Sequence, residues 1–150
     1  MRVVLQRVSE ASVTVDNQVT GKINQGFLLL VGIEGEDNLD DIEWLVRKIL
    51  SLRVFGDDDG KMNLDISQVD GSILAVSQFT LHAKYKKGSR PSFIRAAHPD
   101  QATPLFDTFV YKMSQALGKK VETGIFGAHM DVSLVNDGPV TLVLDTKNKE

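Results

Sequence analysis

The sequence predicts a mixed α/β fold in which strands predominate and two main helices pack against them. Runs of β-branched and apolar residues that are typical of strands recur along the chain, and two stretches place apolar residues at helical spacing. No repeat, linker or shift in composition divides the 150 residues. Residues 1–150 are therefore expected to form a single domain, which at this size buries about 68–70% of its unfolded surface.

Strand patterns dominate the first half of the chain. Residues 2–8 alternate between apolar and polar types, as in a strand with one buried face. An Asp16-Asn17 pair between two β-branched segments indicates a β-hairpin turn. Continuous apolar runs at 26–33 and 72–79 are typical of strands that are buried on both faces, so each is expected to be covered on both sides.

Two helices are expected to accompany these strands. Asn38 can cap the first helix, with Asp40 and Asp41 near its positive end. Pro104 is expected at the start of the second helix and Gly118 at its end. The apolar positions expected to face the core are Leu39, Ile42, Leu45, Val46 and Ile49 in the first helix and Leu105, Phe109, Met113 and Leu117 in the second.

The chain is expected to return to strands after the second helix. Three candidate strands span 120–125, 130–136 and 139–145, and the last of them follows a Gly138-Pro139 step. One interpretation of this step is a plain turn that opens the last strand. The other is a cis peptide bond, which only proline commonly adopts, in about 5–6% of X–Pro bonds.

Composition excludes several kinds of chemistry and location. The chain has no Cys, which excludes disulfides, thiolate zinc sites and a Cys nucleophile. The longest apolar run, residues 27–31, is too short to span a membrane, and Met1 leads directly into a strand pattern rather than a signal peptide. We expect a soluble cytoplasmic protein that uses no metal and no cofactor.

The charge of the chain is unevenly distributed. The net charge is −3, yet no acidic residue occurs between positions 81 and 97. A local basic stretch of this kind suits a phosphate backbone whatever the overall charge. A solvated loop is the alternative interpretation. The basic residues of the stretch are Lys84, Lys86, Lys87, Arg90 and Arg95.

Ser77 and Thr80 supply the hydroxyl groups that a nucleophilic mechanism requires. His82 lies two residues beyond Thr80, so a strand would place both on one face and allow a Thr–His dyad. A surface histidine in a basic loop is the simpler interpretation of His82, and the one we favour. No Gly-x-Ser-x-Gly elbow is present, which argues against a conventional serine hydrolase. His98 and His129 are assigned no role.

Five segments, in one order and at a characteristic spacing, carry a resemblance to a known family. They are the opening residues 1–8, Ser-Gln-Phe-Thr-Leu at 77–81, Gly-Ser-Arg-Pro-Ser-Phe at 88–93, Thr-Gly-Ile-Phe-Gly-Ala at 123–128, and Val-Ser-Leu-Val-Asn-Asp-Gly-Pro-Val-Thr at 132–141. In these segments the chain resembles the D-aminoacyl-tRNA deacylases, ester hydrolases that remove D-amino acids from tRNA. The resemblance covers nearly the whole chain and implies a barrel-like mixed β-sheet packed with two main helices.

The resemblance implies a site that two subunits of a homodimer share. Gly138 and Pro139 match a cis Gly-Pro pair that enters the neighbouring subunit's pocket, where both carbonyl oxygens contact the substrate's α-amino group. An L side chain would collide with this backbone, whereas a D side chain points away and glycine has none. The implied substrate is therefore tRNA that carries a D-amino acid or glycine. Arg7 is implied to orient the Gly-Pro loop of the partner through a polar contact; the alternative interpretation is a surface strand residue.

The resemblance also implies a reaction centre lined by Ser77, Gln78, Phe79 and Thr80. Backbone N–H groups of Phe79 and Thr80 would hold the developing oxyanion, a contribution worth about 2.7–4 kcal/mol per donor in other enzymes. Thr80 would act either as a nucleophile or as a small hydroxyl beside a water that the tRNA 2′-hydroxyl assists. The lack of a compelling base near Thr80 in the sequence favours the second scheme.

RNA contacts are implied on two sides of this centre. Phe126 and Met130 match positions that cradle the terminal adenosine, although both are equally explained as core residues. The tRNA backbone would be contacted by Lys84, Lys86, Lys87 and Arg90. Two rival functions stay open at this point. A broad small-ester hydrolase would leave the basic stretch unexplained, and a non-catalytic RNA-binding module would bind charged tRNA without hydrolysing it.

Overall fold

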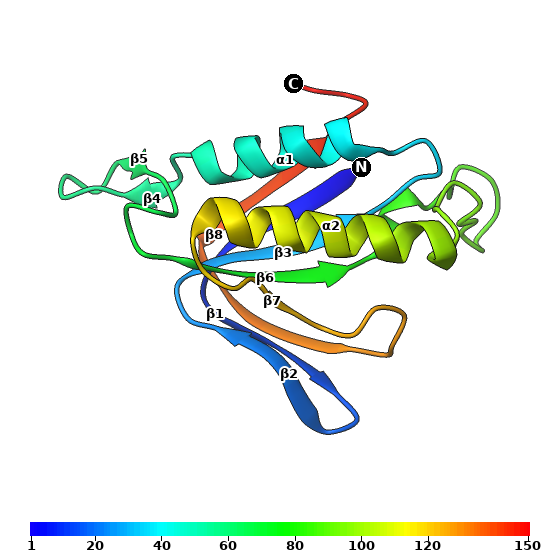
Figure 1. Cartoon of the computed structure of the whole chain (residues 1–150), viewed down its shortest axis with the longest axis horizontal. Helices are drawn as coiled ribbons and strands as arrows, with labels where there is room; N and C mark the ends of the chain where they lie inside the picture. Colours follow the sequence, from blue (N-terminus) through cyan, green and yellow to red (C-terminus); the bar gives the residue numbers. More distant parts are fainter.

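A computed structural model describes all residues from 1 to 150. It shows a curved six-stranded sheet with two helices over one face and a small two-stranded hairpin at one side (Figure 1). The predicted class, a mixed α/β domain with a barrel-like sheet and two main helices, is confirmed. In chain order the elements are β1 (Arg2–Val15), β2 (Gln18–Ile23), β3 (Gly26–Gly32), α1 (Leu39–Ser51), β4 (Phe55–Gly56), β5 (Met62–Leu64), β6 (Ser72–Ser77), the 3₁₀ turn η1 (Phe79–His82), α2 (Pro99–Leu117), β7 (Glu122–Thr123) and β8 (Asp131–Asp145).

The long strand β1 is the centre of the sheet. Along one edge it pairs antiparallel with β3 and then with β2, and along its other edge it pairs antiparallel with β8. β3 continues into a parallel pair with β6, and β6 into a parallel pair with β7. The sheet curls so far that β2 approaches β7: a Cβ added at Gly21 would lie 2.6 Å from the Thr123 carbonyl oxygen. This close backbone approach nearly closes the barrel.

Two apolar clusters fill the two sides of the sheet. The larger, with 21 buried residues, lies between the sheet and the two helices, and the smaller, with 8 buried residues, lies within the curl. β3 supplies both, because Phe27 and Leu29 point to the first cluster and Leu28 to the second. The prediction that this apolar run is buried on both faces is therefore confirmed. Neither helix is long and apolar enough to cross a membrane.

Local signals in the sequence place three of the turns and caps correctly. Asp16 and Asn17 both have positive φ, 48° and 62°, as a type I′ hairpin turn requires. The Asn38 side chain accepts a hydrogen bond from the backbone N–H of Asp40, which caps α1. Gly118 ends α2 in the left-handed conformation, with φ of 79°.

The predicted start of the second helix is wrong. α2 begins at Pro99, and Nδ1 of His98 caps it by accepting a hydrogen bond from the backbone N–H of Asp100 at 3.3 Å. Pro104 therefore lies inside the helix instead of at its first position. The physical reason is that Pro99 already meets the preference for proline in the first turn, where no intrahelical N–H is needed.

The predicted strands after α2 also differ from the structure. Of residues 120–125 only Glu122–Thr123 form a strand, and the separate candidates 130–136 and 139–145 are one strand, β8. β8 stays continuous because the Asn136 side chain accepts from the backbone N–H of Val140 at 2.9 Å and donates to its carbonyl oxygen at 3.4 Å. The Asn136 side chain thus bridges residues 137–139 and ties the two parts of the strand together.

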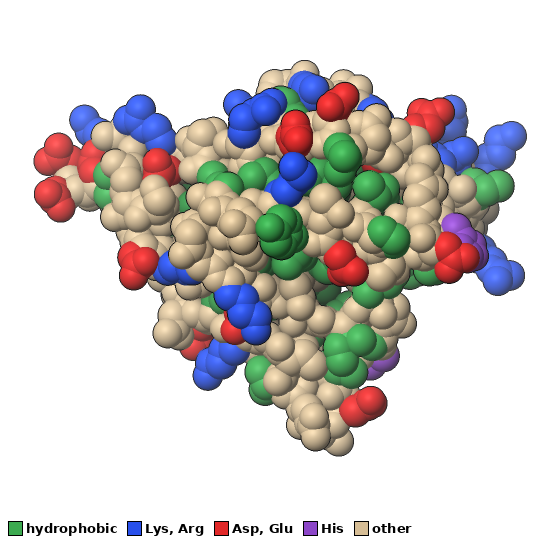
Figure 2. All heavy atoms as spheres, in the orientation of Figure 1, with side chains coloured by type: hydrophobic (Ala, Val, Ile, Leu, Met, Phe, Trp, Pro, Cys, Tyr) green, Lys and Arg blue, Asp and Glu red, His purple; other side chains and the backbone are tan.

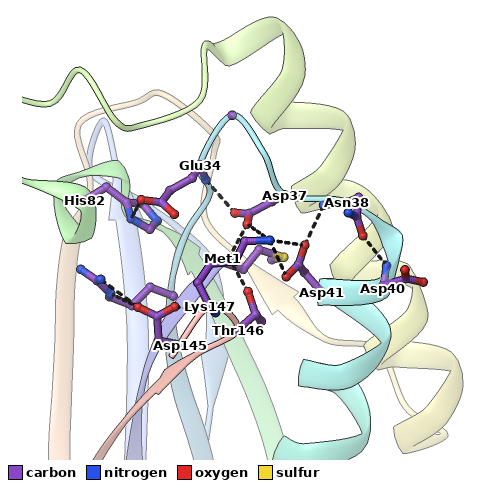
Figure 3. Close-up of polar contacts among 12 residues, drawn as sticks. Met1, Glu34, Asp37, Asn38, Asp40, Asp41, His82, Asp145, Thr146 and Lys147 are labelled. Atoms are coloured by element: carbon purple, nitrogen blue, oxygen red, sulfur yellow. Dashed lines mark hydrogen bonds and ion pairs between the residues drawn. The ribbon is translucent and has the colours of Figure 1, made fainter. Parts of the chain in front are cut away.

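A buried polar network joins the two ends of the chain to α1 (Figure 3). The α-amino group of Met1 donates to Asp37 Oδ1 at 2.5 Å and to Thr146 Oγ1 at 2.8 Å. Lys147 Nζ contacts Asp41 Oδ1 at 3.1 Å. Burial acts to raise the pKa of Asp41, but hydrogen bonds, including those from Thr146 and Lys147, outweigh it and hold this pKa below its ordinary value.

Asp41 should make the stability of the fold depend on pH on the acid side. Because its pKa is lower in the folded chain, its contribution is complete above the unfolded value of about 3.9 and is lost as the pH falls through the folded value. Urea unfolding should give a smaller free energy of unfolding at about pH 3 than at about pH 6. Lys147→Met should reduce this difference, since it removes a group that lowers the pKa. Equal pH dependence in the variant and the wild type would contradict the assignment.

Candidate functional site

A pocket of about 490 Å³ opens where the parallel strands β3 and β6 end and α2 begins. Ser77, Gln78 and Phe79 form one side of it. Phe93 and Phe126 supply further aromatic walls. The carboxyl ends of parallel strands are a common place for ligand sites, because the loops that follow neighbouring strands meet there. The pocket thus brings together Ser77, Gln78 and Phe79, which were expected at the reaction centre, and Phe126, which was expected at the adenosine.

The segment 77–82, called the reaction turn below, leaves β6 in a conformation that was not predicted. The expected strand 72–79 stops at Ser77, and Phe79–His82 form a 3₁₀ turn. The Gln78 backbone N–H donates to the Val31 carbonyl at 2.7 Å, which holds the start of the turn against β3. The N–H groups of Phe79 and Thr80 begin the turn, so no carbonyl within the turn can accept from them. They are available to an oxygen atom of a ligand.

Thr80 lies beside the pocket rather than among the residues that line it. Its hydroxyl accepts a hydrogen bond from Gln78 Nε2 at 2.5 Å. Thr80 is exposed, whereas His82 is only 2% exposed, so the two side chains point to opposite sides of the turn. The interpretation of His82 as a surface histidine is therefore wrong, and the 3₁₀ turn also removes the strand geometry on which the Thr80–His82 dyad depended.

The two residues expected at the adenosine have different surroundings. Phe126 lines the pocket and lies 6.0 Å from the ring of Phe106. Met130 packs with the smaller apolar cluster, and a Cβ added at Gly124 would run into its sulfur atom. Phe93, which ends the 88–93 motif but was assigned no role, lines the pocket and lies edge-on to Phe79 at 5.1 Å between ring centroids. The aromatic wall is therefore built from Phe79, Phe93 and Phe126.

Gly138 and Pro139 lie in a bulge that projects from the sheet. The register of β1 and β8 passes from Gln6 opposite Thr141 to Val8 opposite Asn136, so two steps along β1 span five along β8. Residues 137–140, which stand opposite the single residue Arg7, project from the ladder. The Gly138–Pro139 peptide bond is cis, as the resemblance implied, and both residues are exposed.

Arg7 holds this bulge within its own chain. Its Nε donates to the Asp137 carbonyl at 3.0 Å and lies 3.4 Å from the Asp137 carboxylate. Its Nη1 donates to the Val54 carbonyl. The contact that the resemblance placed between subunits is thus seen between Arg7 and the loop of the same subunit.

The bulge and the pocket of one chain lie at opposite ends of β3. Arg7 pairs with Phe27 at the start of that strand, whereas Val31, which pairs with Ser77, lines the pocket. Four residues of β-strand separate the two levels, which is about 13 Å. Gly138 and Pro139 are not among the residues that line the pocket of their own chain.

The basic stretch forms an exposed loop directly after the reaction turn. All five basic residues are exposed. Four of them take part in no ion pair and are called the basic loop below: Lys84, Lys86, Lys87 and Arg90. Arg95 instead contacts Glu34 Oε1 at 2.5 Å. Lys and Arg side chains gather at the end of the molecule where this loop lies (Figure 2). Their charge is free to attract an anionic ligand at that end.

Two further residues were missed by the sequence analysis. His98 lines the pocket as well as capping α2, and the signal that could have found it was the His-Pro-Asp sequence at the true helix start. Glu34 contacts both His82 and Arg95 although it lies 48 residues before His82 in the chain. No local pattern indicates such a contact.

Comparisons with known proteins agree with this architecture. The family model for D-Tyr-tRNA(Tyr) deacylase matches residues 4–145. The chain is 61% identical over 150 residues to the D-aminoacyl-tRNA deacylase of Chromobacterium violaceum, and 57% identical over 150 residues to that of Flavobacterium johnsoniae, covering 100% of both chains in each case.

Two solved structures resemble the fold. A protein described as c-Myc DNA Unwinding Element Binding Protein superposes with a TM-score of 0.92 at 40% identity, over 97% of this chain and 99% of that one. A probable eukaryotic D-amino acid tRNA deacylase superposes with a TM-score of 0.80 over 95% and 97% of the two chains, and at 18% identity this likeness concerns the fold alone. The family match and the full-length relatives show that the chain belongs to the D-Tyr-tRNA(Tyr) deacylase family.

Gly138 should tolerate no side chain. Its φ is +136°, and an added Cβ would lie 3.0 Å from Arg7 Nη2 and 3.0 Å from the backbone nitrogen of Val140. Gly138→Ala should therefore lower the free energy of unfolding by about 1–3 kcal/mol, measured by urea denaturation. The matched control is Gly35→Ala, where a Cβ would meet nothing within 4 Å. If both variants were as stable as the wild type, the bulge would be more adaptable than its geometry indicates.

Proposed function

We propose that this protein hydrolyses the ester bond of D-aminoacyl-tRNA, releases the D-amino acid and free tRNA, and accepts glycyl-tRNA as well. The observation that carries the proposal is a pocket with the free backbone N–H groups of Phe79 and Thr80 and the Thr80 hydroxyl at its edge. The chain is also 61% identical over its full length to a relative named D-aminoacyl-tRNA deacylase. We place this activity in the cytoplasm, where charged tRNA is used.

The chemistry that we propose depends on positioning more than on a protein base. Water attacks the ester carbonyl carbon, and the N–H groups of Phe79 and Thr80 stabilise the oxyanion that forms. The bond to the ribose oxygen then breaks, which leaves the carboxylic acid of the amino acid and the restored ribose hydroxyl. His82 lies buried on the far side of the turn from Thr80, which supports assistance by the tRNA 2′-hydroxyl over a protein nucleophile.

The chirality filter that we propose comes from a second subunit. Gly138 and Pro139 lie about 13 Å from the pocket level of their own chain, at the other end of β3. A two-fold partner could insert its own bulge into the pocket, and the same operation would complete both sites. Backbone carbonyl groups would then exclude an L side chain whatever its identity, while D-amino acids and glycine fit.

The surface of β8 supports a homodimer. β8 pairs with β1 alone, so the outer edge of a 15-residue strand carries free backbone groups, which is a common place for pairing with another chain. Val135 and Val143 on this strand are 49% and 68% exposed. The bulge with Gly138 and Pro139 belongs to the same strand, so a partner bound here would lie next to it.

The proposal is tested by mixing the protein with D-tyrosyl-tRNA and L-tyrosyl-tRNA and following loss of the ester. We expect rapid hydrolysis of the D ester and little of the L ester. Equal hydrolysis of both, together with equal hydrolysis of a D-tyrosine ester that lacks RNA, would favour a broad small-ester hydrolase. Binding of charged tRNA without hydrolysis would favour an RNA-binding module.

The protein should be a homodimer at working concentration, because a single subunit lacks the Gly-Pro wall of its own pocket. Light scattering should give twice the mass of one chain, and specific activity should fall when dilution separates the subunits. A monomer that keeps full activity and full chiral selection would refute the shared site.

The Thr80 hydroxyl should assist the reaction without being required for it. Thr80→Ala should slow hydrolysis but leave measurable activity, because the oxyanion donors and the tRNA 2′-hydroxyl remain. Thr80→Ser is the matched control and should be close to the wild type, since it keeps the hydroxyl. A tRNA that ends in 2′-deoxyadenosine should be a poor substrate. Full activity on that tRNA, with none left in Thr80→Ala, would identify Thr80 as the nucleophile.

Neutralising the basic loop should weaken the use of tRNA without changing chiral selection. Phosphate contacts give an affinity that falls with salt, whereas the amino acid is selected at the backbone wall. The triple Ala variant of Lys84, Lys86 and Lys87 should therefore show a raised KM, a shallower salt dependence and an unchanged D/L ratio.

The control for this variant removes the same charge elsewhere, by changing the exposed residues Lys22, Lys48 and Lys61 to Ala. It should leave KM and the salt dependence close to those of the wild type. The same KM and salt slope in both triple variants would mean that the acceptor stem does not follow the basic loop.

A further inference from the structure

Glu34 lies just beyond β3 and contacts two segments that build the pocket. Its Oε1 is 3.1 Å from Nδ1 of His82, the last residue of the reaction turn, and 2.5 Å from Nη2 of Arg95. The Glu34 side chain is only 12% exposed. Figure 3 shows its carboxylate directed at the imidazole. One carboxylate therefore faces the reaction turn and the loop that follows it.

His82 depends on this carboxylate for its polar contact. The imidazole is 2% exposed, and neither of its nitrogens has a hydrogen bond of good geometry to another group. Glu34 Oε1 is the charged atom within ion-pair distance of it. A buried polar group without a partner is unfavourable, so an imidazole that lost the carboxylate would be more stable in a different position. Any such movement carries the end of the reaction turn with it, because His82 is part of that turn.

The second contact reaches the opposite wall of the pocket. Arg95 lies two residues after Phe93, whose ring is edge-on to Phe79 at 5.1 Å. The loop around it is joined to the same strand end, because the Ala97 backbone N–H donates to the Ile33 carbonyl at 2.9 Å. Glu34 therefore contacts both His82 on the reaction turn and Arg95 on the loop. These two contacts hold the segments that carry Phe79 and Phe93 at their distance from each other.

Glu34 itself is held in a rigid frame. Its backbone N–H donates to Asp37 Oδ2 at 2.7 Å, and the other carboxylate oxygen of Asp37 accepts from the Met1 amino group (Figure 3). Gly32, two residues earlier, packs so closely on the reaction turn that a Cβ there would lie 3.0 Å from the Gln78 carbonyl oxygen. The carboxylate is thus a fixed point against which the turn and the loop can be located.

We propose that Glu34 is a positioning residue of the deacylase site. Through His82 and Arg95 it keeps the oxyanion donors of the reaction turn in a fixed position relative to the wall that contains Phe93. It touches no substrate in this role. The inference rests on the function proposed above, in that the positioned groups are those of the ester hydrolysis. Catalysis by positioned backbone donors is sensitive to small displacements, since a shift of about 1 Å can cost about 100-fold in rate.

The test compares Glu34→Gln with Glu36→Gln, an exposed residue of the same loop that loses the same charge. Single-turnover hydrolysis of D-tyrosyl-tRNA should be about 10- to 100-fold slower in Glu34→Gln. KM should change much less, and the D/L ratio should stay the same, because the basic loop and the Gly-Pro wall are intact. Glu36→Gln should match the wild type in all three quantities.

A double-mutant cycle shows whether Glu34 acts through His82. His82→Leu removes the imidazole and keeps an apolar side chain in its place. If Glu34 works through His82, the double variant should lose much less rate than the product of the two single losses, because the two residues form one unit. Fully multiplicative losses would overturn this route.

Amide hydrogen exchange supplies a readout that does not depend on activity. Glu34→Gln should speed exchange over residues 78–97 but not in α1 or β8, and Glu36→Gln should do neither. A lower melting temperature in Glu34→Gln with an unchanged rate well below it would make Glu34 merely structural and overturn the inference. Unchanged rate and unchanged exchange would overturn it as well. A wild type that does not hydrolyse D-tyrosyl-tRNA would defeat the proposed function, and exchange over 78–97 would still decide whether Glu34 holds the turn.

Discussion

The antiparallel pairing of β1 with strands on both of its edges is the constraint on which the rest of the structure depends. β8 runs beside almost its whole length on one edge, while β3 and β2 share the other. Because one strand sets the register of three others, the ends of the chain meet at Met1 and Thr146, and the bulge of β8 projects beside Arg7. A slip of one residue in this pairing would reverse the face of every side chain and dismantle both apolar clusters.

The same register separates two parts that the proposed reaction needs together. The pocket forms where β3 and β6 end, and the Gly138–Pro139 bulge forms beside the level where β3 begins. A rigid sheet cannot bring these levels together within one subunit. In the proposed homodimer a second copy brings them together, and the free edge of β8 offers a surface for this assembly. A site completed across a two-fold axis also couples activity to assembly.

The residues around the pocket suit catalysis by positioned backbone groups. Its polar edge is a short turn with free N–H groups, its walls are aromatic, and the one histidine of the turn is buried on the opposite side. The contacts of Glu34 with His82 and Arg95 lie behind the pocket. In the proposed site, these side chains fix the backbone and do not touch the ester. In the proposed reaction, the 2′-hydroxyl of the tRNA takes the part that a protein base has in other hydrolases.

The sequence by itself determined the elements whose signals are local: the Asp16-Asn17 turn, the Asn38 and Gly118 caps, the strand buried on both faces, and, through the resemblance of its motifs, the barrel-like fold and the family. These follow from backbone preferences and apolar periodicity, which act over a few residues. Only the tertiary structure decided the rest. His82 is buried against Glu34, which lies 48 positions earlier in the chain, and 130–136 and 139–145 fall in one strand, which pairs with β1 on both sides of the bulge. The separation of the bulge from the pocket likewise comes from strand register, which depends on contacts between segments far apart in the chain.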